Sequence, residues 1–286
     1  MWKRLLGWLI LAGVVVAALG GLALLPGVRD AVSELRYVTF HAIGLHDAGL
    51  YLLSPRRRVP CEESVRGRAL VALIAGQSNA ANSGDRRHVS RQNVYNFYHG
   101  RCYRARDPLV GAQGTGGSIW SRLGDRLVEG RRYERVLVVP VAVSGTQIER
   151  WAPSGDLHAR ILDAITRTRA AGIQITHVLW QQGESDASAG TSKEQYMAAF
   201  EEMVKSMRDA GVGAPVYVAL TTRCGRPKPA AAAIRSAQAA VVDPSHNVFA
   251  GPDIDALGEE YRQADECHLN EAGLERSAAL WLERLR

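Results

Sequence analysis

Hydrophobic and polar positions form a repeating pattern from residue 66 onward. Short β-branched runs are each followed by a longer segment in which apolar residues recur at helical spacing. The runs are ALVALIA (69–75), NVYNFY (93–98), RVLVVPVAV (135–143), THVLWQQ (176–182) and PVYVALTT (215–222). Three of them are almost continuously apolar, which is typical of parallel strands that are covered on both faces.

The segments after these runs have the pattern of helices. They are 119–130, 157–172, 193–211, 229–243 and 271–285. Several end in glycine directly after basic or apolar residues, which is a common helix stop. The alternation predicts a three-layer α/β/α fold with a flavodoxin-like, doubly wound parallel sheet of about five strands. In such a sheet, ligands bind at the carboxyl ends of the strands.

The N-terminus has a different pattern. No charged or strongly polar side chain occurs from Leu5 to Leu25, and Lys3 and Arg4 precede this run. This run has 21 residues, and a helix of that length crosses a bilayer core of roughly 30 Å. A cleaved signal peptide is the alternative, because the flank is basic and small residues lie near the end of the run. We favour a transmembrane helix, because the run is longer than the apolar core of most signal peptides.

The pattern therefore predicts a membrane anchor over residues 1–26, a connector over 27–65 and a globular domain over 66–286. The charge bias across the apolar run is weak. We expect the short N-terminus inside and the globular domain outside the cytoplasm, either periplasmic or extracellular. Cleavage of the N-terminal segment would make the protein secreted.

Charge and cysteine content narrow the function classes. The net charge is +6, but the basic residues are scattered, whereas a nucleic-acid site needs a clustered stripe. The cysteines, Cys61, Cys102, Cys224 and Cys267, contain no CxxC pair, so a structural zinc site has little support. Their even number is compatible with two disulfides in an oxidising compartment, and four free thiols are the alternative.

Polar clusters follow three of the predicted strands and precede the last helix. They are GQSN (76–79), SGTQIERW (144–151), WQQGESD (180–186) and DECH (265–268). A serine becomes a nucleophile when a base removes its proton, and the base is normally a histidine held by an acid. Asp265 and His268 can supply this pair for Ser78.

Each cluster also has a structural alternative. A serine beside glycine and asparagine is often a turn residue, and Asp265 before a helix can be a cap. By residue type alone, other histidines are candidates for the base: His41, His46, His88, His99, His158, His177 and His246. The placement of all the clusters at the binding edge favours catalysis.

These clusters resemble the four blocks of SGNH hydrolases, in the branch of sialate O-acetylesterases and acetyl-xylan esterases. The resemblance implies that Ser78 is the nucleophile, His268 the base and Asp265 its acid. It implies that Ser78 and Gly145 donate backbone N–H groups to an oxyanion, with the side-chain amide of Gln182 as a third donor.

Three further polar residues are candidates for substrate binding: Gln77, Asn79 and Glu184. Asn79 is also an alternative to Gln182 as the amide donor. Glu184 is expected to orient loops or a neighbouring side chain, because an ionised carboxylate would oppose an oxyanion.

The chain departs from the family pattern in two places. Ala80, Ala81 and Asn82 stand where the branch usually has a methionine and, soon after it, a glycine. Ser185 stands where the third block of the broader superfamily has an asparagine. We expect these changes to affect the third oxyanion donor and the acyl site.

Two cysteines lie near the predicted base. Cys267 stands between Asp265 and His268, and Cys224 follows the fifth predicted strand at the same edge. A disulfide between them would hold the loop of the base and leave Cys61 to pair with Cys102. Because four cysteines allow three pairings, this pairing is a hypothesis based on location.

The resemblance implies a serine esterase that removes O-acetyl groups from carbohydrate through an acyl-enzyme, without a metal or other cofactor. The expected partners are an acetylated carbohydrate and, through the N-terminal helix, a membrane. Two alternatives stay open. The protein could be an O-acyltransferase acting on envelope polysaccharide, or a carbohydrate-binding protein that kept the fold and lost catalysis.

Overall fold

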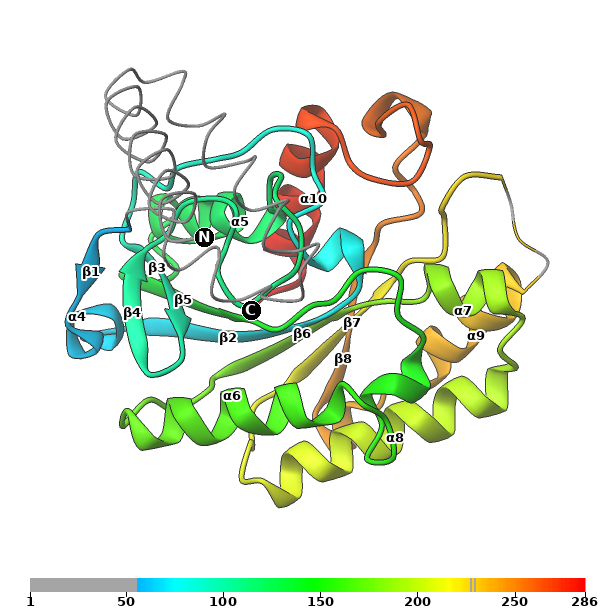
Figure 1. Cartoon of the computed structure of the whole chain (residues 1–286), viewed down its shortest axis with the longest axis horizontal. Coiled ribbons are helices and arrows are strands. Elements are labelled where there is room, and N and C mark those ends of the chain that lie inside the picture. Colours follow the sequence, from blue (N-terminus) through cyan, green and yellow to red (C-terminus); the bar gives the residue numbers. More distant parts are fainter. Residues whose placement is uncertain (1–55, 227, 229, 286) are drawn as a thin grey trace, which may run out of the picture. The chain divides into compact units, whose positions relative to one another are not determined.

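The computed structural model describes residues 56–226, 228 and 230–285. Its centre is an eight-stranded sheet with the strand order β1-β4-β3-β5-β2-β6-β7-β8 (Figure 1). The strands are β1 (Arg58–Val59), β2 (Ala69–Gly76), β3 (Val94–Tyr98), β4 (Arg101–Arg104), β5 (Arg135–Pro140), β6 (His177–Gln181), β7 (Val216–Leu220) and β8 (Val248–Asp253). All neighbours from β3 to β8 are parallel, whereas β4 is antiparallel to both β3 and β1.

The five predicted strands are present. Four of them, together with β8, form the parallel order β5-β2-β6-β7-β8, which is the flavodoxin-like order 2-1-3-4-5 counted along the chain. The predicted strand 93–98, which is β3, lies outside β5 and is not part of this order. Strand β8 was not predicted, because its sequence VFAGPD contains a glycine and a proline, which are rare in strands. Pro252 is tolerated there because β8 is an edge strand.

Helices cover both faces of the sheet, which confirms the α/β class with a mostly parallel sheet (Figure 1). On one face, α5 (Ile119–Glu129) and α10 (Glu271–Arg284) pack against Leu70, Ala72 and Ile74 of β2. The helices on the other face are α4 (Cys61–Val65), α6 (His158–Ala170), α7 (Glu184–Ala189), α8 (Lys193–Asp209) and α9 (Ala231–Ala240). Side chains alternate along a strand, so the continuously apolar β2 contributes to two cores.

The folded unit begins earlier than the sequence analysis predicted. Residues 56–65, assigned there to the connector, include β1, which pairs with β4, and Cys61, which forms a disulfide with Cys102. The predicted anchor, residues 1–26, and the connector up to residue 55 lie outside the described residues. Within the part of the chain that the structure describes, no helix is both long and apolar enough to cross a membrane.

Candidate active site

Three of the four polar clusters lie side by side because their strands are neighbours in the sheet. β2 lies between β5 and β6, and its last residue, Gly76, is in register with Gln181 at the end of β6. Beyond β5, the N–H of Val143 donates to the Gly76 carbonyl oxygen over 3.0 Å. The GQSN, SGTQ and QGES segments therefore leave the sheet at the same edge.

Ser78 begins a short 3-10 turn, Ser78–Ala80, directly after β2. The turn requires glycine at position 76, where φ is +137° and a Cβ would lie 2.0 Å from the Gln181 carbonyl oxygen. Ser78 is 5% exposed. Among the described residues, neither its N–H nor its hydroxyl has a hydrogen-bond partner. The N–H and the hydroxyl of Ser78 are therefore both left to interact with a ligand.

Asp265 and His268 form a pair in the loop before α10. His268 Nδ1 lies 2.6 Å from Asp265 Oδ2, and Asp265 Oδ1 accepts the N–H groups of Cys267 and His268. Partial burial acts to raise the pKa of Asp265, but the two amides and the imidazole outweigh it and keep this pKa below its ordinary value. An ionised aspartate fixes the tautomer of the imidazole, so that Nε2 faces outward as a base.

The loop of His268 contacts the loop of Ser78. Asn79 Nδ2 donates to the Cys267 carbonyl oxygen over 3.3 Å, and the N–H of Asp85 donates to the Leu269 carbonyl oxygen over 3.3 Å. Within the described residues, no hydrogen bond joins Ser78 Oγ to His268 Nε2. Such bonds are often long without substrate and tighten only when it binds.

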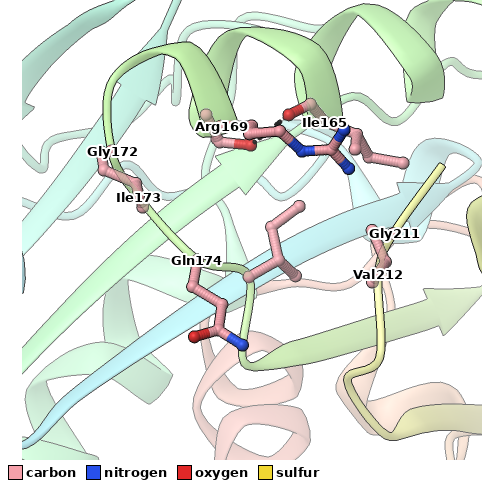
Figure 2. Close-up of a pocket in the computed structure, with 9 residues that line it drawn as sticks. Ile165, Arg169, Gly172, Ile173, Gln174, Gly211 and Val212 are labelled. Carbon is pink, nitrogen blue, oxygen red and sulfur yellow. Dashed lines mark hydrogen bonds between the residues drawn. The ribbon is translucent and has the colours of Figure 1, made fainter.

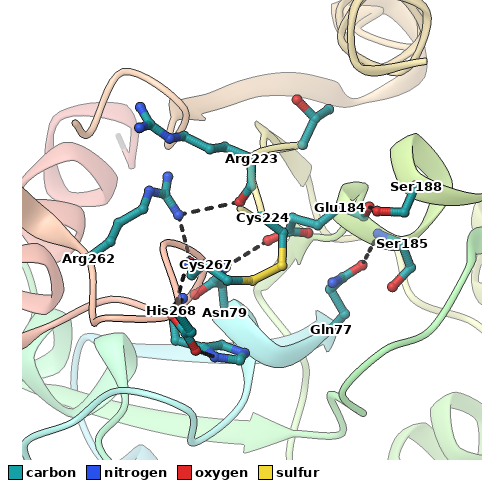
Figure 3. The surroundings of a disulfide bond; sticks show 12 residues. Gln77, Asn79, Glu184, Ser185, Ser188, Arg223, Cys224, Arg262, Cys267 and His268 are labelled. Carbon is teal, nitrogen blue, oxygen red and sulfur yellow. Dashed lines mark hydrogen bonds and ion pairs between the residues drawn. A yellow bond between two sulfur atoms is a disulfide. The ribbon is translucent and has the colours of Figure 1, made fainter. Parts of the chain in front are cut away.

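A disulfide and a buried arginine hold the same loop (Figure 3). Cys267 is bonded to Cys224, beyond the end of β7. With Cys61–Cys102 this bond accounts for all four cysteines, so the predicted pairing is confirmed. Arg262, which is buried, donates to the Cys267 carbonyl oxygen over 2.7 Å. No pattern in the sequence indicates this role, because a single arginine in a polar segment is usually a surface residue.

Gly145 lies in an exposed turn after β5, with φ of +68°. Among the described residues its N–H has no partner. The N–H groups of Ser78 and Gly145 are therefore both unpartnered among the described residues. The oxyanion role that the resemblance implies for them stays a prediction.

Gln182 does not occupy the place predicted for a third oxyanion donor. The side chain is fully buried, and its Nε2 donates to the Thr146 carbonyl oxygen over 2.8 Å and to the carboxylate of Asp186. Its N–H groups are thus committed inside the protein, where they hold the residue that follows Gly145. Only the tertiary contact with the neighbouring loop reveals this role.

The residues predicted to bind substrate are buried as well (Figure 3). Gln77 Oε1 accepts the N–H of Ser185 over 3.1 Å. Glu184 Oε1 accepts from Asn79 Nδ2 over 2.8 Å and from the Thr221 hydroxyl over 3.1 Å. Burial raises the pKa of Glu184, although these two hydrogen bonds act to lower it. Glu184 thus holds neighbouring side chains in place. Ser78 is similarly buried, so burial does not test the role of these three residues, and substrate binding by them stays a prediction.

The other described histidines have no hydrogen bond or ion pair with the GQSN segment. His177 is in the core, where burial lowers its pKa to about 4, and His158 is also buried. His88 pairs with Asp125 and His246 with Asp243. His99 lies in the turn between β3 and β4, and His41 and His46 lie outside the described residues. Among the described histidines, His268 is therefore the candidate base.

A pocket of about 360 Å³ lies away from these residues (Figure 2). Ile165, Ile173 and Val212 form part of its wall, with Arg169 and Gln174 beside them. These residues come from the end of α6 and from the segments that lead into β6 and β7, so the pocket lies at the amino-terminal edge of the sheet. It contains none of the residues of the four polar clusters.

The fold, with a serine directly after β2 and an Asp-x-x-His pair before α10, is that of an SGNH hydrolase. Residues 68–281 match the family model described as "Carbohydrate esterase, sialic acid-specific acetylesterase". The chain therefore belongs to this family of carbohydrate esterases, which are carboxylic ester hydrolases.

Individual relatives are more distant. A probable carbohydrate esterase of Arabidopsis thaliana is 34% identical over 71 residues, which are 25% of this chain and only 27% of that protein. The crystal structure of the same plant protein has a TM-score of 0.63 at 19% identity and covers 76% of this chain and 98% of its own. NanS has a TM-score of 0.52 at 17% identity, covering 76% and 96%. At these identities the similarity shows the fold.

Proposed function

We propose that this protein is a serine esterase that removes O-acetyl groups from carbohydrate. The observation that carries the proposal is the contact between the loop of Ser78 and the loop of the Asp265–His268 pair. Among the described residues, the N–H groups of Ser78 and Gly145 have no partner, which supports acyl transfer. Membership of a family described as sialic acid-specific acetylesterases supports an acetylated sugar as the substrate class.

Each residue then has defined tasks in the reaction. Ser78 Oγ attacks the acetyl carbonyl carbon while His268 Nε2 takes the hydroxyl proton. Asp265 holds the imidazole and stabilises its cation, and the N–H groups of Ser78 and Gly145 bind the oxyanion. His268 returns the proton to the leaving sugar oxygen. It then deprotonates the water that releases acetate and restores Ser78.

Replacement of the nucleophile tests this proposal. Ser78→Ala is expected to abolish hydrolysis of p-nitrophenyl acetate, and a fluorophosphonate probe is expected to label the wild type at Ser78 but not this variant. Full activity of Ser78→Ala would refute the mechanism. An unlabelled, inactive wild type that still binds glycans would favour the carbohydrate-binding alternative. Product analysis with a sugar acceptor separates a hydrolase, which releases acetate, from an O-acyltransferase.

We also propose that the enzyme acts outside the cytoplasm, anchored by residues 1–26. The two disulfides support an oxidising compartment. Separation of membrane and soluble fractions, combined with protease treatment of intact cells, tests both points. A protein that is soluble and protected inside intact cells would contradict the proposal.

A further inference from the structure

The turn that presents Gly145 is held from both sides. A Cβ built at Gly145 would meet no atom within 4 Å, so the direction of its N–H depends on its neighbours. Before it, the N–H of Ser144 donates to Gln113 Oε1 over 2.8 Å. After it, the Thr146 carbonyl oxygen accepts from Gln182 Nε2. An oxyanion donor acts at 2.7–3.1 Å, roughly, so small displacements of this turn affect catalysis.

Gln113 connects the turn to the segment 109–116, which lies between β4 and α5. Besides accepting from Ser144, Gln113 donates its backbone N–H to the Ala142 carbonyl oxygen over 2.9 Å. The two bonds hold alternate residues of the chain that leads to Gly145. A displacement of segment 109–116 therefore displaces this chain as well.

Asn82, four positions after Ser78, holds segment 109–116 in turn and is only 1% exposed. Its Nδ2 donates to the carbonyl oxygens of Leu109 and Ala112 over 3.0 and 3.1 Å, and its Oδ1 accepts the N–H of Leu109 over 2.7 Å. Its backbone N–H donates to the Gln113 carbonyl oxygen, and its carbonyl oxygen accepts the N–H of Gly116. One buried side chain thus ties the nucleophile loop to this segment.

We propose that Asn82 and Gln113 are positioning residues that hold the Gly145 N–H in place as an oxyanion donor. The connection runs from Asn82 through segment 109–116 to Gln113, and from Gln113 to Ser144 and Gly145; we call it the Asn82 relay. The inference rests on the proposed esterase function, in which that N–H acts. Asn82 belongs to the stretch where this chain departs from the sequence pattern of its branch.

The relay affects the transition state more than the bound substrate, because charge develops on the carbonyl oxygen only during attack. Loss of a whole oxyanion donor lowers kcat by about 10²–10³-fold. A donor that is loosened but not removed is expected to lower kcat by about tenfold, with KM nearly unchanged.

The test uses the full-length protein with Gln113→Met, Asn82→Leu and the double variant. Both substitutions keep the approximate side-chain size and remove the side-chain hydrogen bonds, whereas the backbone hydrogen bonds of both residues remain. Each is expected to lower kcat about tenfold. The kcat of the double variant is expected to be no lower than that of the more impaired single variant, because both residues act on one connection. Thr176→Val, which removes hydrogen bonds to Val71 at the other edge of the sheet, controls for general destabilisation.

An NMR measurement tests the Asn82 relay independently of the proposed esterase function. The amide signal of Gly145 is expected to shift in Gln113→Met and Asn82→Leu but not in Thr176→Val. Unchanged kcat in Gln113→Met, or losses that multiply in the double variant, would overturn the relay while leaving the esterase intact. If the Gly145 amide shifts in these variants but the wild type shows no Ser78-dependent hydrolysis, the catalytic role of the relay is refuted together with the proposed function. Should Asn82→Leu not fold, the partly exposed Gln113 still decides the outcome.

Discussion

Two Asp-x-x-His pairs with the same local geometry lie at opposite edges of the sheet. In each, the aspartate Oδ2 lies 2.6 Å from Nδ1 of the histidine three residues later. The pair Asp243–His246 directly precedes β8, at the amino-terminal edge. The pair Asp265–His268 lies against the GQSN segment, at the carboxyl-terminal edge. By spacing and distance alone, the two pairs cannot be told apart.

Their surroundings differ. The side chain of His246 is 81% exposed, whereas that of His268 is 29% exposed. His246 Nδ1 also contacts the hydroxyl of Ser245, whereas His268 lies in a loop tied by a disulfide. The comparison teaches that the pair itself is a local turn motif. Its chemical role depends on whether a nucleophile lies opposite, and only Asp265–His268 contacts a loop that carries one.

Among the predictions that test this comparison, removal of the His268 imidazole has the largest expected effect on kcat. His268→Ala should lower kcat for p-nitrophenyl acetate by at least about 10³-fold, because no base remains for Ser78. His246→Ala is the matched control and should leave kcat unchanged. Steady-state kinetics on both variants decide the matter. Equal losses would show that the two pairs differ only in general stability.

Replacement of the acid tests orientation rather than proton transfer. Asp265→Asn keeps the shape of the side chain but favours the wrong imidazole tautomer, so kcat should fall by up to about 10⁴-fold. Asp243→Asn should leave kcat unchanged. An active Asp265→Asn variant would mean that the backbone contacts of this loop suffice to orient His268.

The two disulfides provide a smaller and more selective test. They close chain segments of similar length, with sequence separations of 41 and 43, so the chain-entropy model gives each about 4 kcal/mol of stabilisation. Replacing Cys224 and Cys267 by alanine should also lower kcat, by about tenfold, since the loop of His268 is loosened. Replacing Cys61 and Cys102 should lower the melting temperature with kcat unchanged. Kinetics well below both melting temperatures separate these effects, and an undiminished kcat in the first variant would exclude a positioning role for the bond.

The smallest expected effect is on the pKa of a single carboxylate, that of Asp243. The Ser245 hydroxyl, the His246 imidazole and the Ser245 N–H lower the pKa of Asp243 to about 2. A lowered pKa stabilises the folded state above the unfolded pKa, and this stabilisation is lost as the pH falls toward 2. Ser245→Ala should raise the pKa of Asp243 in an NMR titration while activity stays unchanged. An unaltered titration would show that the hydroxyl is not the main cause.

Much of the fold could be predicted because its signals are local. The apolar runs and the glycine stops located the strands from β2 to β7 and five helices, but β4 was missed as a short antiparallel partner of β3. The place of β3 outside β5 could not be read, because an apolar strand has the same pattern at any position in the sheet. The short strand β8, with its glycine and proline, lacks the pattern on which the prediction depends.

The candidate site was predicted unevenly, for a related reason. Ser78, Gly145, Asp265 and His268 lie where their clusters placed them. The buried positions of Gln77, Gln182 and Glu184 were not foreseen, because a polar residue at a strand end is equally suited to bind a ligand or to brace a loop. Asn82 and Gln113 left no signal at all, because their contacts join segments far apart in the chain.

The sequence by itself determined the elements of this protein: a serine after a glycine at the end of a buried strand, and an aspartate three residues before a histidine. These depend on backbone conformation and spacing, which are local properties. The resemblance pointed to Asp265 and His268, but only the tertiary structure brought the loop of this pair against the serine loop and decided which amides of the described residues stay unpaired. It did so because the parallel pairing of β5, β2 and β6 brings three loops to one edge, and the contacts of Asn79 and Cys267 add the fourth.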